Sequence, residues 1–280
     1  MFRHESPLGR WTVTTLDVHP LLRGIVRQMW HGEGRVAYAR DRILPAAQST
    51  MLVNLGPPHV VVGGDRTPTR RSFEGVWFAG ISERPVEAEM PHGSCVLGIA
   101  FTATGATRLL PWAQSEVANT IGPLEEVPGR DAGRLRDRLL EDDDAISRLE
   151  RTEEWLLGAC ASGRDIHPLV HWAQRRLAAS GGTVRTEALS REAGYSRKHL
   201  HELFRRQVGL APKALARVIR FQRAVRRMRQ VPKGSWSELA AACGYADQSH
   251  LIRDFREFSG VSPAAFTRLA TPDPASVVVR

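Results

Sequence analysis

The sequence predicts an α+β protein of two domains, a β-rich N-terminal domain and an all-helical C-terminal domain. Short runs typical of β-strands recur between turn residues over about the first 125 residues. After residue 165 a helix-turn-helix pattern occurs twice. Charge divides the chain in the same way, because residues 165–270 hold 19 Lys and Arg against 8 Asp and Glu, whereas residues 1–164 hold 19 against 21. The 280 residues suffice for two such domains.

Seven strand-like runs make up the first region. They read WTVTTLDV, RVAYARDRIL, TMLVNLG, HVVVGG, GVWFAGI, PVEAEM and CVLGIAF. Pro57, Gly63 and Pro91 lie in or between these runs and mark loops. The pattern predicts a small β-barrel or sandwich, followed by a short helix over residues 104–110.

Residues 131–160 are predicted to be helical. Their segment RLRDRLLEDDDAISRLE serves either as a dimerisation helix or as a solvated surface helix. Residues 161–165, ASGRD, follow as a hinge. The predicted domains are therefore 1–160, β-rich to about residue 125, and 165–270.

The second domain contains an internal repeat. Seven pairs of identical residues define it, the first three at an offset of 50 and the others at 51: Leu189 and Leu239, Gly194 and Gly244, Tyr195 and Tyr245, Leu200 and Leu251, Phe204 and Phe255, Gly209 and Gly260, Pro212 and Pro263. We expect helix-turn-helix units near residues 184–208 and 235–259. Gly194 and Gly244 fall in their turns, where the end of a helix favours a left-handed residue. Ser235 and Glu238 predict a capping box at the start of the second unit.

The second helix of each unit buries an apolar side and turns polar residues outward. Such a helix can enter the major groove of DNA. The outward residues that we expect to contact DNA are Arg197, Lys198, His201 and Arg205 in the first unit, and Gln248, Ser249, His250 and Arg253 in the second. Their hydrogen-bonding groups suit base edges and phosphates. The alternative is a solvated face that contacts nothing.

An arginine-rich helix is predicted between the units, over residues 212–230. A helix of about 17 residues is roughly 25 Å long. It would hold the two recognition helices about one turn of DNA apart, roughly 34 Å. We expect only some of its arginines to meet phosphate.

These motifs resemble the AraC/XylS family of bacterial transcription regulators. The resemblance rests on AGYSRKHLHELFRRQVGLAP, on RFQRA in the linking helix, and on CGYADQSHLIRDFREFSGVSP. It covers residues 165–270 and implies a DNA-binding domain with recognition helices near 196–206 and 248–258. Glu202 departs from the basic or amide residue often found at its position, and either accepts a hydrogen bond from cytosine or stays away from DNA.

The N-terminal region resembles the sensor-type domain of one subgroup of these regulators. The segments are RILPAAQSTMLVNLG, FAGISERPVEAEM and VLGIAFTATGATRLL. The resemblance implies a cupin-like β-barrel that binds an effector or pairs subunits. Trp30, Trp77, Phe78 and Phe101 either line an effector pocket or pack in the core.

No catalytic, cofactor or metal site is predicted. His59 and His92 lack the His-x-His spacing of a metal-binding cupin, and the chain has no phosphate-binding loop or nucleophile elbow. Cys95, Cys160 and Cys243 are far apart. Together with the lack of a signal peptide and of a long apolar span, they indicate a cytoplasmic protein without a membrane partner.

The leading interpretation is a non-enzymatic, sequence-specific transcription regulator. Its expected partners are double-stranded promoter DNA, RNA polymerase, a small-molecule effector and a second copy of the chain. One alternative is a self-alkylating repair enzyme, which needs an activated thiolate, and Cys95 has no base or cation beside it in the sequence. The other is a nucleoid protein that binds DNA without regard to sequence.

Overall fold

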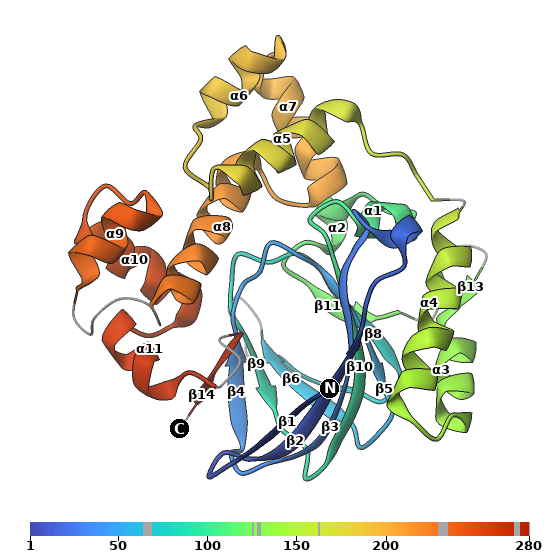
Figure 1. The fold of residues 1–280 in the computed structure, drawn as a ribbon. Coiled ribbons are helices and arrows are strands. Elements are labelled where there is room, and N and C mark those ends of the chain that lie inside the picture. The colour runs from blue at the N-terminus through green and yellow to red at the C-terminus, as the bar shows by residue number, and fades with distance from the viewer. Residues whose placement is uncertain are drawn as a thin grey trace.

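The computed structural model describes residues 1–63, 69–124, 126–127, 130–161, 163–228, 235–271 and 275–279. Figure 1 shows an N-terminal part built of two facing sheets, with helices on one flank, and a C-terminal helical part lying across one end of it. This confirms the expected α+β class. In the part of the chain described, no helix is both long enough and apolar enough to cross a membrane.

An antiparallel sheet of seven strands forms one wall of the N-terminal part, in the order β1-β2-β3-β10-β5-β8-β11. Its strands are β1 (Phe2–Ser6), β2 (Gly9–Leu16), β3 (Val26–Val36), β10 (Ser94–Phe101), β5 (Thr50–Asn54), β8 (Val76–Ala79) and β11 (Ile121–Pro123). The opposite wall has five strands in the order β14-β4-β9-β6-β7. They are β14 (Ser276–Val279), β4 (Arg40–Ile43), β9 (Val86–Glu89), β6 (His59–Gly63) and β7 (Thr69–Phe73). A separate pair joins β12 (Glu126–Val127) to β13 (Arg130–Asp131).

Strands β1, β7, β11, β12, β13 and β14 lie outside the predicted runs, and β3 overlaps one of these runs only at Arg35 and Val36. In β3 the apolar pattern is interrupted by Gly32 and Gly34. Gly32 has a packing reason, because the Trp30 ring lies across it and across Gly98 of β10: a Cβ atom would approach Trp30 Cζ3 to 3.1 Å at Gly32 and Trp30 Cε2 to 2.3 Å at Gly98. A Cβ atom at Gly34 would instead lie 2.4 Å from the carbonyl oxygen of Arg10 on β2. The long strand β3 therefore depends on contacts with β2 and β10 rather than on local alternation.

Helices cover the outer face of the seven-stranded sheet. The predicted helical segment 131–160 forms two helices, α3 (Ala132–Glu141) and α4 (Ala145–Ala161). The Asp144 side chain accepts hydrogen bonds from the backbone N–H groups of Ile146 and Ser147, which starts α4 after the break. Short helices η1 (Pro20–Leu22), α1 (Ala106–Leu109) and α2 (Gln114–Val117) complete this part.

The C-terminal part contains seven helices within the described residues. They are α5 (Pro168–Ala179), α6 (Thr186–Ala193), α7 (Arg197–Val208), α8 (Pro212–Arg227), α9 (Trp236–Cys243), α10 (Gln248–Ser259) and α11 (Pro263–Leu269). Gly194 and Gly244 end α6 and α9 at φ values of 71° and 77°, as the turn pattern predicts. Ser235 stands at the start of α9, but its side chain makes no capping hydrogen bond. Residues 229–230 of the predicted linking helix and residue 162 of the predicted hinge lie outside the described residues.

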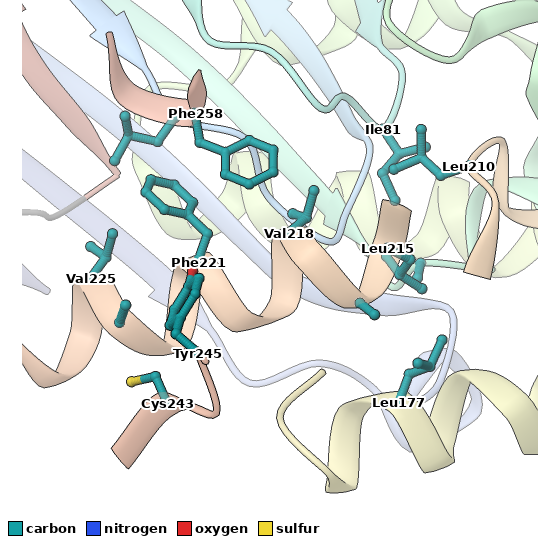
Figure 2. Packing of buried hydrophobic residues seen from close by; sticks show 14 of the residues in the cluster. Ile81, Leu177, Leu210, Leu215, Val218, Phe221, Val225, Cys243, Tyr245 and Phe258 are labelled. Carbon is teal, nitrogen blue, oxygen red and sulfur yellow. The ribbon is translucent and has the colours of Figure 1, made fainter. Parts of the chain in front are cut away.

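Helix α8 is the centre of the C-terminal core. Figure 2 shows Leu215, Val218, Phe221 and Val225 along it, each at most 5% exposed. The same apolar cluster includes Ile81, Leu44 and Ala103 from the N-terminal part. The two parts therefore share a packed boundary.

Candidate nucleic-acid interface

Helix α7 presents the predicted residues of the first unit. Ser196 caps it by accepting from the N–H of His199, and Leu200 and Phe204 are fully buried. Arg197, Lys198, His201 and Arg205 are all exposed. The Arg197 and Lys198 cations lie 3.5 Å and 3.9 Å from Glu187 and Glu202, respectively. Such exposed pairs contribute little energy, so both cations are available to a polyanion.

Helix α10 presents the second set in the same way. Asp247 caps it by accepting from the N–H of His250 at 2.7 Å. Gln248, Ser249 and Arg253 are exposed. The His250 side chain is only 34% exposed, packs edge-on against Tyr245 with ring centroids 5.2 Å apart, and has Nε2 3.9 Å from Asp254. Of the eight predicted contacts, His250 alone is half-buried, in the packing of its own unit.

Two arginines of α8 hold the second unit together. Arg217 donates to Asp254 Oδ1 at 2.8 Å and to Glu257 Oε2 at 2.6 Å, and its guanidinium lies 5.0 Å from the Phe258 ring centroid. These acceptors, with Glu257 foremost, raise the pKa of Arg217 above its ordinary value. Arg220 lies over the Tyr245 ring at 4.9 Å. Both side chains thus have a structural role. This fits the expectation that only some arginines of the linking helix contact phosphate.

Two exposed cations on the recognition helices were not among the predicted contacts, Arg206 on α7 and Arg256 on α10. At the offset of 51, Arg256 is the counterpart of Arg205. The repeat therefore held the signal for Arg256. It held none for Arg206, whose counterpart is Glu257.

The C-terminal ends of both recognition helices rest on the N-terminal part. Thr107 Oγ1 donates to the carbonyl of Gln207 at 2.7 Å, near the end of α7. Arg42 Nη1 donates to the carbonyl of Ser259 at 3.1 Å, at the end of α10, while Nη2 donates to Glu87. The polar N-terminal halves remain exposed. Recognition helices use this half to reach base edges.

Residues 189–269, which span both units, match the family profile described as a helix-turn-helix domain. The C-terminal region is an AraC-type helix-turn-helix domain. The chain is accordingly a DNA-binding transcription regulator. No curated protein matches the sequence.

Three solved structures illustrate what the chain is similar to. ToxT from Vibrio cholerae is 11% identical, with 85% of this chain and 97% of that chain covered at a TM-score of 0.48. The C-terminal domain of AraT, a response regulator from Geobacillus stearothermophilus, is 21% identical, covering 38% and 88% at a TM-score of 0.35. A probable AraC family transcriptional regulator from Rhodopseudomonas palustris CGA009 is 24% identical, covering 35% and 94% at a TM-score of 0.32.

The four aromatic residues predicted for an effector pocket lie on opposite faces of one sheet. Trp30 and Trp77 belong to the cluster between the two sheets. Phe78 and Phe101 belong to the cluster beneath α3 and α4. Neighbouring residues of a strand point to opposite faces, which separates Trp77 from Phe78. The structure thus brings two of the four together on the inner face.

Cys95 has neighbours that its sequence position does not reveal. Its Sγ atom lies 3.4 Å from His31 Nε2 and 3.7 Å from Arg148 Nη1. Burial nevertheless raises the pKa of the Cys95 thiol, with the Arg148 charge opposing the shift. An activated nucleophile needs the opposite, a lowered pKa. This disfavours the self-alkylating enzyme.

Proposed function

We propose that the chain is a sequence-specific regulator that inserts α7 and α10 into two adjacent major-groove segments of promoter DNA. It works in the cytoplasm without enzymatic activity. Its N-terminal domain, residues 1–160, senses a small-molecule effector or pairs two copies of the chain. The DNA-bound protein then contacts RNA polymerase.

The observation that carries this proposal is the matched presentation of two recognition helices by one shared apolar core. Both α7 and α10 bury an apolar side and expose a polar side. Helix α8 packs against α9 and α10 of the second unit and against α5, which in turn packs against α6 and α7 of the first, so that both units share one apolar core. A protein that binds any DNA through charge alone does not require two such readers. Their exposed Arg, Lys, Gln and Ser side chains are the types that read bases.

The contacts at the ends of α7 and α10 supply a route for regulation. A movement of the N-terminal part would displace Gln207 and Ser259, and with them the C-terminal ends of both helices. An effector can shift this arrangement only by its differential affinity for two states. Trp30 and Trp77, which lie in the apolar cluster between the two sheets, are the aromatic residues that we assign to effector binding.

The direct test is to crosslink the native protein in its source cells and to sequence the bound DNA. We expect a small number of sharp peaks that share a motif covering two major-groove segments. Diffuse coverage without a motif would contradict sequence-specific regulation and favour the nucleoid protein.

A substitution tests the reading role of α10. Arg253→Ala should weaken binding to the selected motif by about 1–3 kcal/mol and relax the preference at one base position, because a bidentate contact to a base is lost. Binding is measured on the motif and on single-base variants at one salt concentration. Arg10→Ala is the matched control, since it removes an exposed cation from the N-terminal part. An equal loss on every sequence would make Arg253 a phosphate contact.

A further inference from the structure

Three side chains with metal-ligating atoms meet on the outer face of the seven-stranded sheet. His31 and Glu33 are two residues apart on β3 and therefore share a face, and Cys95 on β10 is the cross-strand partner of Glu33. One ligand atom from each lies within 4.8 Å of the other two. His31 is 1% exposed, Cys95 is half-buried and Glu33 is exposed.

The spacing of the two inner atoms already fits a small metal ion. In a tetrahedral site with ligands about 2.0–2.3 Å from zinc, neighbouring ligand atoms lie about 3.3–3.8 Å apart. His31 Nε2 and Cys95 Sγ are 3.4 Å apart. Glu33 is exposed, so its carboxylate can close the remaining distance without repacking.

A cation already occupies the point on which these lone pairs converge. Arg148 Nη1 lies 3.1 Å from His31 Nε2 and 3.7 Å from Cys95 Sγ. Arginine is always a donor, so Nε2 presents its lone pair rather than a hydrogen. The remaining donors of Arg148 are held elsewhere, because Nε and Nη2 bond to the carbonyl of Asp142 and Nε also bonds to that of Leu139. Among the nitrogen atoms of Arg148, Nη1 is therefore the one that lies against His31 and Cys95.

We propose that His31 Nε2, Cys95 Sγ and the Glu33 carboxylate bind a zinc-class divalent ion in competition with Arg148. Nitrogen, thiolate and carboxylate ligands together suit this class of metal. Glu33 and Cys95 also line an open hollow of about 430 Å³, from which water reaches the fourth position. Binding displaces the Arg148 Nη1 group and releases the thiol proton to bulk solvent.

The pattern was invisible in the sequence because its members are distant along the chain. His31 and Cys95 are separated by 64 positions, and only the pairing of β3 with β10 brings them together. His59 and His92, which lack the spacing of a metal-binding cupin, take no part in this cluster. The proposal concerns binding alone and does not depend on the proposed function.

Cobalt(II) is the probe for the test, because thiolate ligation gives a charge-transfer absorption that zinc removes on displacement. The full chain is prepared without a histidine tag and with its cysteines reduced. We expect one cobalt ion per chain with this absorption, and its loss in Cys95→Ala. Cys160→Ala should retain it, since Cys160 is a buried cysteine outside the cluster. Glu33→Gln, at an exposed position, should weaken binding by about tenfold without affecting the fold.

Arg148→Gln is the more decisive variant, because it removes the charge that competes with the metal ion and should therefore strengthen binding. Most substitutions near a metal site weaken binding instead. We expect its cobalt affinity to rise by at least about tenfold relative to the parent chain. Circular dichroism confirms that each variant is folded. No thiolate absorption in the parent chain, absorption that persists in Cys95→Ala, or an Arg148→Gln variant that binds no more tightly would each overturn the proposal.

Discussion

Asp41 shows how one residue can make stability depend on pH. It lies on β4 at 8% exposure, and its Oδ1 atom has no hydrogen-bond partner among the described residues. The neighbouring cations do not neutralise it, since Arg40 and Arg42 pair with Glu89 and Glu87 on β9. Burial raises the pKa of Asp41 to about 6, and the hydrogen bond with Ser276 opposes this shift only in part. Ionised Asp41 is thus disfavoured in the folded state.

The sign of the pH effect follows from the raised pKa. The contribution of Asp41 to the unfolding free energy is fully present below the ordinary carboxyl pKa of 3.8, and it is lost as pH rises through about 6. Asp41→Asn cannot ionise, so it should exceed the parent in unfolding free energy by about 2–3 kcal/mol at pH 8. The two should converge near pH 4. Chemical denaturation at both pH values measures this.

Asp137→Asn is the control for that experiment, because it removes an exposed carboxylate from α3. It should leave the unfolding free energy nearly unchanged at both pH values. If Asp41→Asn differed from the parent by the same amount at pH 4 and pH 8, packing rather than ionisation would explain the difference.

At the scale of elements, the two helix-turn-helix units use the same turn in different surroundings. Gly194 and Gly244 both adopt a left-handed conformation. A Cβ atom at Gly194 would meet nothing within 4 Å, whereas one at Gly244 would lie 2.3 Å from Thr183 Cγ2. The two turns thus share one backbone conformation but differ in how closely other residues pack around the glycine.

This difference predicts unequal costs for the same substitution. Gly194→Ala should lower the unfolding free energy by about 1–2 kcal/mol, the cost of a left-handed alanine. Gly244→Ala should cost more, because it adds the clash with Thr183. In the Gly244→Ala background, Thr183→Ser should recover the excess, since it removes Cγ2 and keeps the hydroxyl that donates to Ser180. Equal costs at the two glycines, or no recovery, would contradict this account.

Elements also differ in how far the sequence alone predicts them. The helical units were predictable because their signals are local: a glycine in the turn, an apolar stripe, and a proline after it. Strand β3 was not predictable, because Gly32 packs against the Trp30 ring and Gly34 against the backbone of β2, and no apolar alternation encodes these contacts. The exposed residues of α7 and α10 were predictable from the repeat. Their contacts with Thr107 and Arg42 were not, since no local pattern encodes a boundary between domains.

At the scale of the whole molecule, the chain returns to its first domain after the DNA-binding domain. Strand β14 pairs with β4, from Ser276 opposite Ile43 to Val279 opposite Arg40. Val277 is 1% exposed and belongs to the C-terminal core, and it also bridges to Ala270 after α11. The predicted domain 165–270 ends before this strand. The strand joins the edge of the N-terminal sheet to the last helix of the DNA-binding domain.

Removal of β14 should lower the local stability of both β4 and α11. In a chain that ends at residue 274, the Leu44 N–H loses the carbonyl of Ala275, to which it donates at 2.8 Å. Hydrogen exchange of the Leu44 amide should accelerate by at least about tenfold, which corresponds to a loss of about 1.4 kcal/mol in the free energy of local opening. Amides of α11 should accelerate with it, because Val277 no longer packs beside them. Val53, in the other sheet, should be unchanged.

Val277→Ala separates the two contributions of the strand, because it keeps the backbone pairing and removes two buried methyl groups. It should accelerate exchange in α11 more than at Leu44. Mass spectrometry of exchanged peptides distinguishes these regions in all three chains. Unchanged exchange in α11 after truncation would mean that the strand covers the edge of β4 without holding the DNA-binding domain. Parallel acceleration would mean that the last four paired residues couple the sheet to the helices that meet DNA.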